Sequence, residues 1–299
     1  GWIPIEDDTV TDVPYKGNSE GIFGYGKNNG TYVSMTNLVS NAGIVSSDVT
    51  GVGTGRRYQG ACEYGGDKGI FGYGGTPSVV SMTNLVSNAG VVSSDVTGVG
   101  TARYGLAACE YGGDKGIFGY GDDGSEVSMT NLVSNTGVVA TDVTGVGTAR
   151  KYTAACEYGG DKGIFGFGGN NAVNTAVTNL VSNAGVVASD TTGVGLSRGG
   201  VAACGYGYDK GIFGYGEPNA TGISNLVSNA GVVASDTAGV GTARYQLGAC
   251  EYGYDKGIFG FGAMDAGNVS NLVSNVGVIA SDVATGGTAR YGPAACSFN

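Results

Sequence analysis

Acidic and basic side chains recur at one fixed spacing along this chain. In six places an Asp is followed eight residues later by an Arg: Asp48 and Arg56, Asp95 and Arg103, Asp142 and Arg150, Asp190 and Arg198, Asp236 and Arg244, and Asp282 and Arg290. Such guanidinium groups could bind an anion, or each could form charge-assisted hydrogen bonds with a carboxylate within or between repeats. Because a pair present in every copy serves a scaffold better than a single ligand site, the spacing predicts structural ion pairs.

A tyrosine follows within two residues of the Arg in five of these six places. The five candidate ligand-binding tyrosines are Tyr58, Tyr104, Tyr152, Tyr245 and Tyr291. Exposed Tyr beside Asn, Asp and Ser is suited to stacking on sugar rings and to hydrogen bonding with their hydroxyl groups. The alternative is that these rings pack against a neighbouring repeat.

The same periodicity extends to almost the whole chain, which contains six copies of one unit of about 47 residues. The string GIFGYG or GIFGFG occurs once in each copy, starting at Gly21, Gly69, Gly116, Gly163, Gly211 and Gly257. The string NLVSN and a single Cys recur in step with it. We therefore expect one repeat domain over residues 21–299 and an N-terminal arm or tether over residues 1–20.

Each unit offers four short strands. Around the third GIFGYG these are residues 107–111, 116–120, 127–134 and 138–143, and a Gly-Gly-Asp-Lys turn joins the first two. Such a tight turn requires antiparallel pairing, which argues against the alternative of a parallel β-solenoid. The pattern predicts an all-β fold, namely a six-bladed β-propeller of four-stranded antiparallel blades. The chain ends on a copy of the first strand, at residues 294–298, which is predicted to complete the first blade.

The copies differ mainly in two stretches, one after GIFGYG and one after the Arg. The first comprises residues 27–32, 75–80, 122–127, 169–175, 217–222 and 263–268. Both stretches leave an up-and-down blade on the same side, so the variation is predicted to lie on one face. A constant frame with variable loops is typical of a recognition module, with drift in tolerant loops as the alternative. The loops add five candidate ligand-binding residues: Asn29, Asp122, Asp123, Asn170 and Asn219.

The unit resembles the kelch-type propeller repeat. In that pattern an Arg precedes the innermost strand and Gly follows the second strand, as Arg103, residues 107–111 and Gly119-Tyr120-Gly121 do here. The Tyr and Trp that the family carries on its outer strands are missing from these units.

The string GGDKGIFGYG followed by NLVSN, GVVASD and TGVGTAR also resembles repeats in predicted virion proteins of tailed phages from aquatic samples. This resemblance implies a tail-fibre or virion-surface protein that is assembled in the host cytoplasm. Its implied partners are a host-surface carbohydrate or receptor and, through the N-terminal arm, other virion subunits. An extracellular location is the alternative, and a purely structural decoration or spacer subunit is the alternative function.

Composition argues against several other functions. The net charge of −10 disfavours nucleic acid as a partner, and no apolar stretch is long enough for membrane insertion. The chain has no His, which excludes catalytic triads and His-ligated metals. The acids peculiar to single copies are scattered over separate loops, so a sialidase-like glycan hydrolase is less favoured than a protein without catalytic activity. We expect neither a cofactor nor a bound metal.

The six cysteines lie in runs of Ala and Gly and are predicted to be buried free thiols. Glu63, Glu110, Glu157 and Glu251 directly follow four of them. These carboxylates could line an axial channel and hold a hard cation, which is the less favoured interpretation because only four of six copies carry one.

Overall fold

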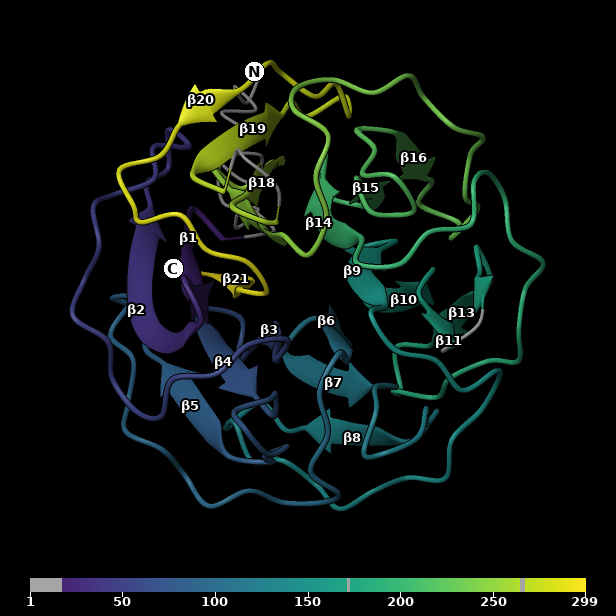
Figure 1. The fold of residues 1–299 in the computed structure, drawn as a ribbon. Coiled ribbons are helices and arrows are strands. Elements are labelled where there is room, and N and C mark those ends of the chain that lie inside the picture. The colour runs from purple at the N-terminus through teal and green to yellow at the C-terminus, as the bar shows by residue number, and fades with distance from the viewer. Residues whose placement is uncertain (1–17, 171–172, 264–266) are drawn as a thin grey trace, which may run out of the picture.

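The computed structural model describes residues 18–170, 173–263 and 267–299 (Figure 1). Within these ranges the chain forms strands and turns and no helix. Most of the predicted N-terminal arm, residues 1–17, lies outside the described residues. The last three residues assigned to the arm belong to the fold instead, because Glu20 begins β1 and Ser19 N–H donates to Asn299 O at 2.9 Å.

The described residues form six small antiparallel sheets and one two-stranded ribbon. In the order of pairing, the sheets are β2 (Thr31–Val39), β1 (Glu20–Asn28) and β21 (Ala294–Phe298); β3 (Gly60–Tyr64), β4 (Lys68–Gly72) and β5 (Thr83–Val86); β6 (Ala107–Tyr111), β7 (Lys115–Gly119) and β8 (Thr130–Val133); β9 (Ala154–Tyr158), β10 (Lys162–Gly166) and β13 (Thr178–Val181); β14 (Ala202–Tyr206), β15 (Lys210–Gly214) and β16 (Ser224–Val227); and β17 (Gly248–Tyr252), β18 (Lys256–Gly260), β19 (Val269–Val273) and β20 (Val283–Ala284). The ribbon consists of β11 (Gly169–Asn170) and β12 (Val173–Asn174). The predicted all-β, antiparallel organisation is confirmed.

The hairpin of β6 and β7 shows why these short segments form strands. Cys109 pairs with Ile117, and Ile117 pairs in turn with Leu132 of β8. The turn between β6 and β7 needs positive φ, which Gly112 and Gly113 adopt at 67° and 77° without a side-chain clash.

The predicted fourth strand is wrong for most units, because in the described part of the chain only the last unit has one, β20. Elsewhere the segment meets the third strand through separate backbone bridges, such as Val133 with Val139 and Thr130 with Val143. The pairing slips by one residue between these two bridges, which interrupts the ladder. The Asn131 side chain fills the gap, since its Nδ2 donates to Ala140 O at 3.0 Å.

The sheets follow one another around a common centre in a propeller-like order (Figure 1). Around this centre β3 contacts β6, β6 contacts β9, β9 contacts β14, and β14 contacts β17. The C-terminal strand β21 contacts both β17 and β3. The C-terminal strand β21 pairs with β1, with Cys296 opposite Ile22. The end of the chain therefore supplies the strand that the first unit lacks.

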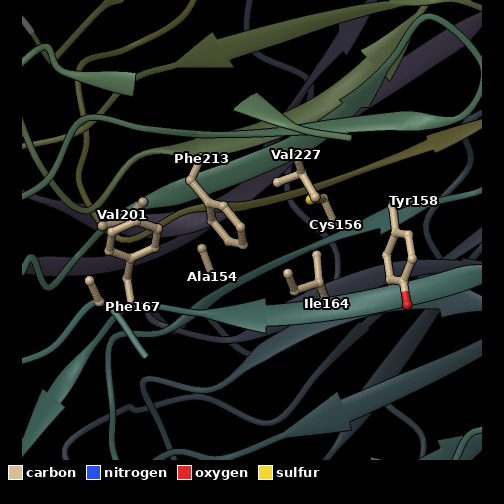
Figure 2. Packing of buried hydrophobic residues seen from close by; sticks show 9 residues of the cluster. Ala154, Cys156, Tyr158, Ile164, Phe167, Val201, Phe213 and Val227 are labelled. Atoms are coloured by element: carbon tan, nitrogen blue, oxygen red, sulfur yellow. The ribbon is translucent and has the colours of Figure 1, made fainter. Parts of the chain in front are cut away.

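Neighbouring sheets interlock through Cys and Phe side chains that lie over glycines. A methyl group added to Gly116 would be 2.5 Å from Cys62 Sγ, and one added to Gly72 would be 2.7 Å from the Phe118 ring. All six cysteines are free and buried in this way. Figure 2 shows the equivalent cluster in which Cys156 lies near Phe213 and Val227 of the next sheet.

Candidate functional site

The variable stretches of adjacent units lie together at one end of the sheets. The residue directly after each recurring Arg forms an antiparallel backbone bridge with the first loop residue of the next unit. These bridges join Lys27 with Tyr291, Arg57 with Gly75, Tyr104 with Asp122, Lys151 with Gly169, Gly199 with Glu217, and Tyr245 with Ala263. The nearly constant turns meet each other elsewhere, for example where Asn88 Nδ2 donates to Asp67 Oδ2 at 3.2 Å. The sequence differences among units are thus brought together around one set of bridges.

One residue beyond each bridge, six backbone N–H groups donate in a cycle that returns to its starting residue. Tyr58 donates to Gly292, Gly292 to Gln246, Gln246 to Gly200, Gly200 to Tyr152, Tyr152 to Gly105, and Gly105 to Tyr58, over 2.7 to 3.1 Å. All six residues have positive φ, and every second one is Gly. The alternation has a steric cause, because a methyl group added to Gly292 would be 2.7 Å from the Tyr58 ring.

The five predicted tyrosines therefore occupy two different positions, which the sequence interpretation did not distinguish. Tyr104, Tyr245 and Tyr291 directly follow the Arg and form bridges to the next loop. Tyr58 and Tyr152 come one residue later and belong to the hydrogen-bonded cycle. A shift of one residue thus moves the side chain from the loops to the centre.

Tyr58 and Tyr152 cover the centre of this end of the molecule. Their rings meet edge to face with centroids 5.2 Å apart, and Tyr58 Oη donates to Gln246 Oε1 at 2.9 Å. The centroid of the Tyr104 ring lies 6.1 Å from the centroid of each of these two rings. Burial raises the pKa of Tyr152 to about 12 and also raises the pKa of Tyr58. Both hydroxyl groups are therefore neutral near pH 7 and available as hydrogen-bond donors or acceptors.

Two grooves open among the variable stretches. The larger, of about 670 Å³, brings the predicted residues Tyr58, Tyr245, Tyr291 and Asn29 together with Lys27, Arg57 and Gln246. The smaller, of about 310 Å³, is lined by Lys151, Tyr152, Asn170, Asn174 and Glu217 among others. Burial raises the pKa of the Glu217 carboxyl.

Asp122, one of the predicted ligand-binding residues, is engaged in a salt bridge. Its side chain is buried, and Lys151 Nζ donates to its Oδ2 at 2.6 Å. Burial opposes its ionisation, but the hydrogen bond from Lys151 and others outweigh this and hold its pKa below the ordinary value. Asp122 therefore links the loop after β7 to the segment that leads into β9 of the next sheet. Asp123 and Asn219, by contrast, are exposed and lie outside the linings of both grooves.

The recurring arginines are fully or almost fully buried. Arg103 is typical: its Nε donates to Tyr120 O at 2.8 Å, its Nη1 to Thr101 O at 3.1 Å and its Nη2 to Asn131 Oδ1 at 2.7 Å. Its guanidinium also lies 4.4 Å from the centroid of the Tyr73 ring of the preceding sheet. Burial lowers the pKa of these arginines, to about 10 for Arg198 and Arg290, so they stay cationic near neutral pH.

Each Arg faces the Asp of the following unit and not the one eight residues before it. The ion pairs are Arg56 with Asp95, Arg103 with Asp142, Arg244 with Asp282, and Arg290 with Asp48, over 3.8 to 4.0 Å. Arg150 and Arg198 are attracted in the same way to Asp190 and Asp236. The pairs thus run from unit to unit and include the step from the last unit to the first.

The carboxylates of these ion pairs lie closer to Asn and Thr residues than to the arginines. Asp142 accepts from Asn131 Nδ2 at 2.9 Å, from Thr101 N at 3.0 Å and from Thr101 Oγ1 at 2.7 Å. Burial opposes its ionisation, but these hydrogen bonds outweigh it and hold its pKa below the ordinary value. The buried Asn of NLVSN bridges Arg and Asp, a role that the sequence interpretation missed although this Asn recurs in every copy.

The cysteine-bearing strands surround a cavity of about 50 Å³ at the centre. Burial raises the pKa of Glu63 and Glu110, and hydrogen bonding between the two carboxyl groups raises it further for Glu110. Asn18 Nδ2 donates to Glu63 Oε2 at 2.7 Å. In the part of the chain that the structure describes, no three His, Cys, Asp or Glu side chains are arranged to hold a metal ion. Glu63 and Glu110 therefore bind protons more tightly than exposed carboxyl groups do.

Comparisons with protein-family models and with curated protein sequences find no match for this chain. Among the described residues there is also no helix long and apolar enough to cross a membrane. The kelch-like and virion-protein resemblances therefore stay predictions from the sequence.

Proposed function

We propose that the chain is a six-bladed β-propeller, closed where β21 completes the first sheet, that binds a host-surface carbohydrate or receptor and has no catalytic activity. Closure is supported by the hydrogen-bonded cycle of six units and by the contacts of β21 with β3 and β17. The observation that carries the binding proposal is the convergence of variable loops on two grooves, one lined by the half-buried Tyr58 and the other by the half-buried Tyr152.

The chemistry of the grooves favours a saccharide. Ligand sites commonly measure about 300–1,000 Å³, a range that includes both grooves. Tyr rings offer apolar faces for a sugar ring, while Asn29, Asn170 and Gln246 offer amide groups for its hydroxyls.

Binding without catalysis is the better fit to these linings. Hydrolysis of glycosides generally requires two carboxyl groups about 5–9.5 Å apart across the scissile bond. Among the described lining residues of the two grooves, Glu217 is the one carboxylic acid. Among the described residues, neither lining therefore contains the second carboxyl group that such a pair requires.

The setting we propose is the surface of a virion, with an extracellular location as the alternative. This part rests on the sequence resemblance to phage virion proteins. In that setting residues 1–20, or the part of them that precedes the fold, would attach the domain to other virion subunits.

A glycan array probed with the full chain tests the proposal. A chimaera in which residues 27–32 are replaced by residues 75–80 changes a variable loop that lines the larger groove and should alter the set of glycans retained. The matched control replaces residues 112–115 with residues 207–210, which exchanges one Gly-Asp turn for another and should leave the set unchanged. Equal changes in both chimaeras, turnover of a bound glycan, or the absence of any binding would each contradict the proposal.

A structural spacer is a second candidate function, favoured by one observation. The turns after the third strands carry a repeated set of valine and isoleucine side chains that are 63–68% exposed: Ile44, Val91, Val138, Val186, Val232 and Val278. Exposed apolar side chains in a repeated set are suited to contact with another subunit. A domain that binds no glycan but is incorporated stably into particles would support this function instead.

A further inference from the structure

The larger groove lies at the seam where the first and last units meet. Residues from both ends of the chain line it, including Lys27 from the first loop and Tyr291 from the last unit. Lys27 Nζ lies 4.8 Å from the centroid of the Tyr32 ring, and the Arg57 guanidinium lies 5.8 Å from the same centroid. Two cationic side chains from the lining of this groove therefore flank the Tyr32 ring.

Neither cation forms an ion pair with any residue that the structure describes. The described lining of the groove contains no Asp or Glu, although the chain as a whole has a net charge of −10. Two like charges that face one groove repel each other, and an anion bound between them would offset that repulsion.

Another unit of the same chain provides an internal comparison. Lys151 directly follows its recurring Arg, as Arg57 does. Its Nζ lies 2.6 Å from Asp122 Oδ2 and 3.4 Å from Glu126 Oε1. Asp122 is the first residue after GIFGYG, the place that Lys27 takes in the first unit. The same backbone arrangement thus pairs a cation with two acids in one unit and places two cations together at the seam.

The guanidinium of Arg57 is held in place by aromatic neighbours. Its Nη1 donates to Tyr291 Oη at 2.8 Å. Its Cζ lies 4.5 Å from the centroid of the Tyr58 ring and 5.3 Å from the centroid of the Tyr291 ring. Its other side-chain N–H groups donate to no residue in the described ranges. A fixed guanidinium with spare donors is suited to a carboxylate or sulfate, which can accept two of its hydrogen bonds.

Gln246 adds a neutral donor to the groove. Its Oε1 accepts the Tyr58 hydroxyl at 2.9 Å, so its Nε2 amide group can donate to a ligand. The groove therefore combines two cations, aromatic rings and an amide, which together match the acid group, the ring and the hydroxyls of an acidic sugar.

We propose that the seam groove binds an acidic sugar, with Arg57 and Lys27 holding its anionic group and the faces of Tyr58 and Tyr291 contacting its ring. This inference rests on the proposed function and specifies the ligand class of its larger groove. A uronic acid or other carboxylated sugar and a sulfated sugar share the chemistry that this site recognises.

Isothermal titration calorimetry with oligogalacturonate, its methyl ester and a sulfated galactan oligosaccharide tests the inference. We expect the wild-type chain to bind at least one of the two acidic ligands about tenfold or more tightly than the neutral ester, with a preference that weakens in salt. Lys27→Gln and Arg57→Gln should each abolish most of this preference. Lys115→Gln, which removes a cation from a Gly-Asp turn, is the matched control and should bind as the wild type does. Thermal melting of each variant establishes that it is folded.

The outcomes separate this inference from the proposed function. Binding of only the carboxylated or only the sulfated ligand supports the inference and identifies the anion. Equal affinity for acid and ester, or an acid preference that survives both substitutions, overturns it, while loop-dependent binding of neutral glycans would leave the proposed function standing. If neither the array nor calorimetry detects any saccharide, the proposed function itself is overturned.

Discussion

Substitution of Arg103 by Met tests whether the buried arginines hold neighbouring units together. Methionine keeps an unbranched apolar chain of similar length, so the cavity it leaves is small. It removes the donors that now satisfy Tyr120 O and Asn131 Oδ1, both buried, and Thr101 O, which is partly buried. It also removes the cation that lies against Tyr73.

The size of the expected loss follows from these contacts. A hydrogen bond from a charged donor contributes about 1.5–3 kcal/mol, with the lower end appropriate to the partly buried carbonyl. The contact of the cation with the ring adds roughly 0.5–1 kcal/mol. These contacts together amount to about 5–8 kcal/mol, and removal of the buried cation recovers part of its desolvation cost. We therefore expect the free energy of unfolding to fall by about 4–6 kcal/mol, which is a large part of the roughly 5–15 kcal/mol of a typical domain.

Urea unfolding followed by far-ultraviolet circular dichroism measures this change. Arg103→Lys keeps the charge but loses the planar fork, so it should lie between wild type and Arg103→Met. Arg57→Met is the comparison variant, since Arg57 is half-buried and donates one side-chain hydrogen bond, and it should cost about 1.5–3 kcal/mol, less than Arg103→Met. A loss below about 1 kcal/mol for Arg103→Met, with an unchanged m-value, would refute the reasoning.

Two further predictions concern the centre of the molecule. Burial raises the folded-state pKa of Glu110, so its favourable contribution is complete below the unfolded pKa of about 4.3 and is lost as the pH rises through the folded value. Measured by urea unfolding, the stability of Glu110→Gln relative to wild type should therefore rise as the pH is raised from 4 to 8; a difference that stays constant over this range would contradict this. Gly116→Ala should lower the melting temperature because its methyl would meet Cys62 Sγ at 2.5 Å, and the double variant with Cys62→Ala should recover part of the loss; additive effects would show that the two residues do not interact.

Some features of this protein follow from local sequence. The short apolar segments and the Gly-Gly-Asp-Lys turn between β6 and β7 predict an antiparallel hairpin, because a tight turn brings only adjacent residues together. The small residues around each Cys predict that it is buried. The prediction of a full fourth strand failed because the Asn131 side chain takes part of the backbone pairing, a competition that residue patterns do not reveal.

The sequence by itself determined that one unit recurs six times and where its copies vary. The tertiary structure decided which Asp each Arg faces, since that depends on how one unit is placed against the next. It also decided that Tyr58 lies in the central cycle while Tyr104 lies among the loops, and that Lys27 and Arg57 share a groove. These arrangements join residues from different units, and their physical cause is packing between sheets, which no spacing within one unit specifies.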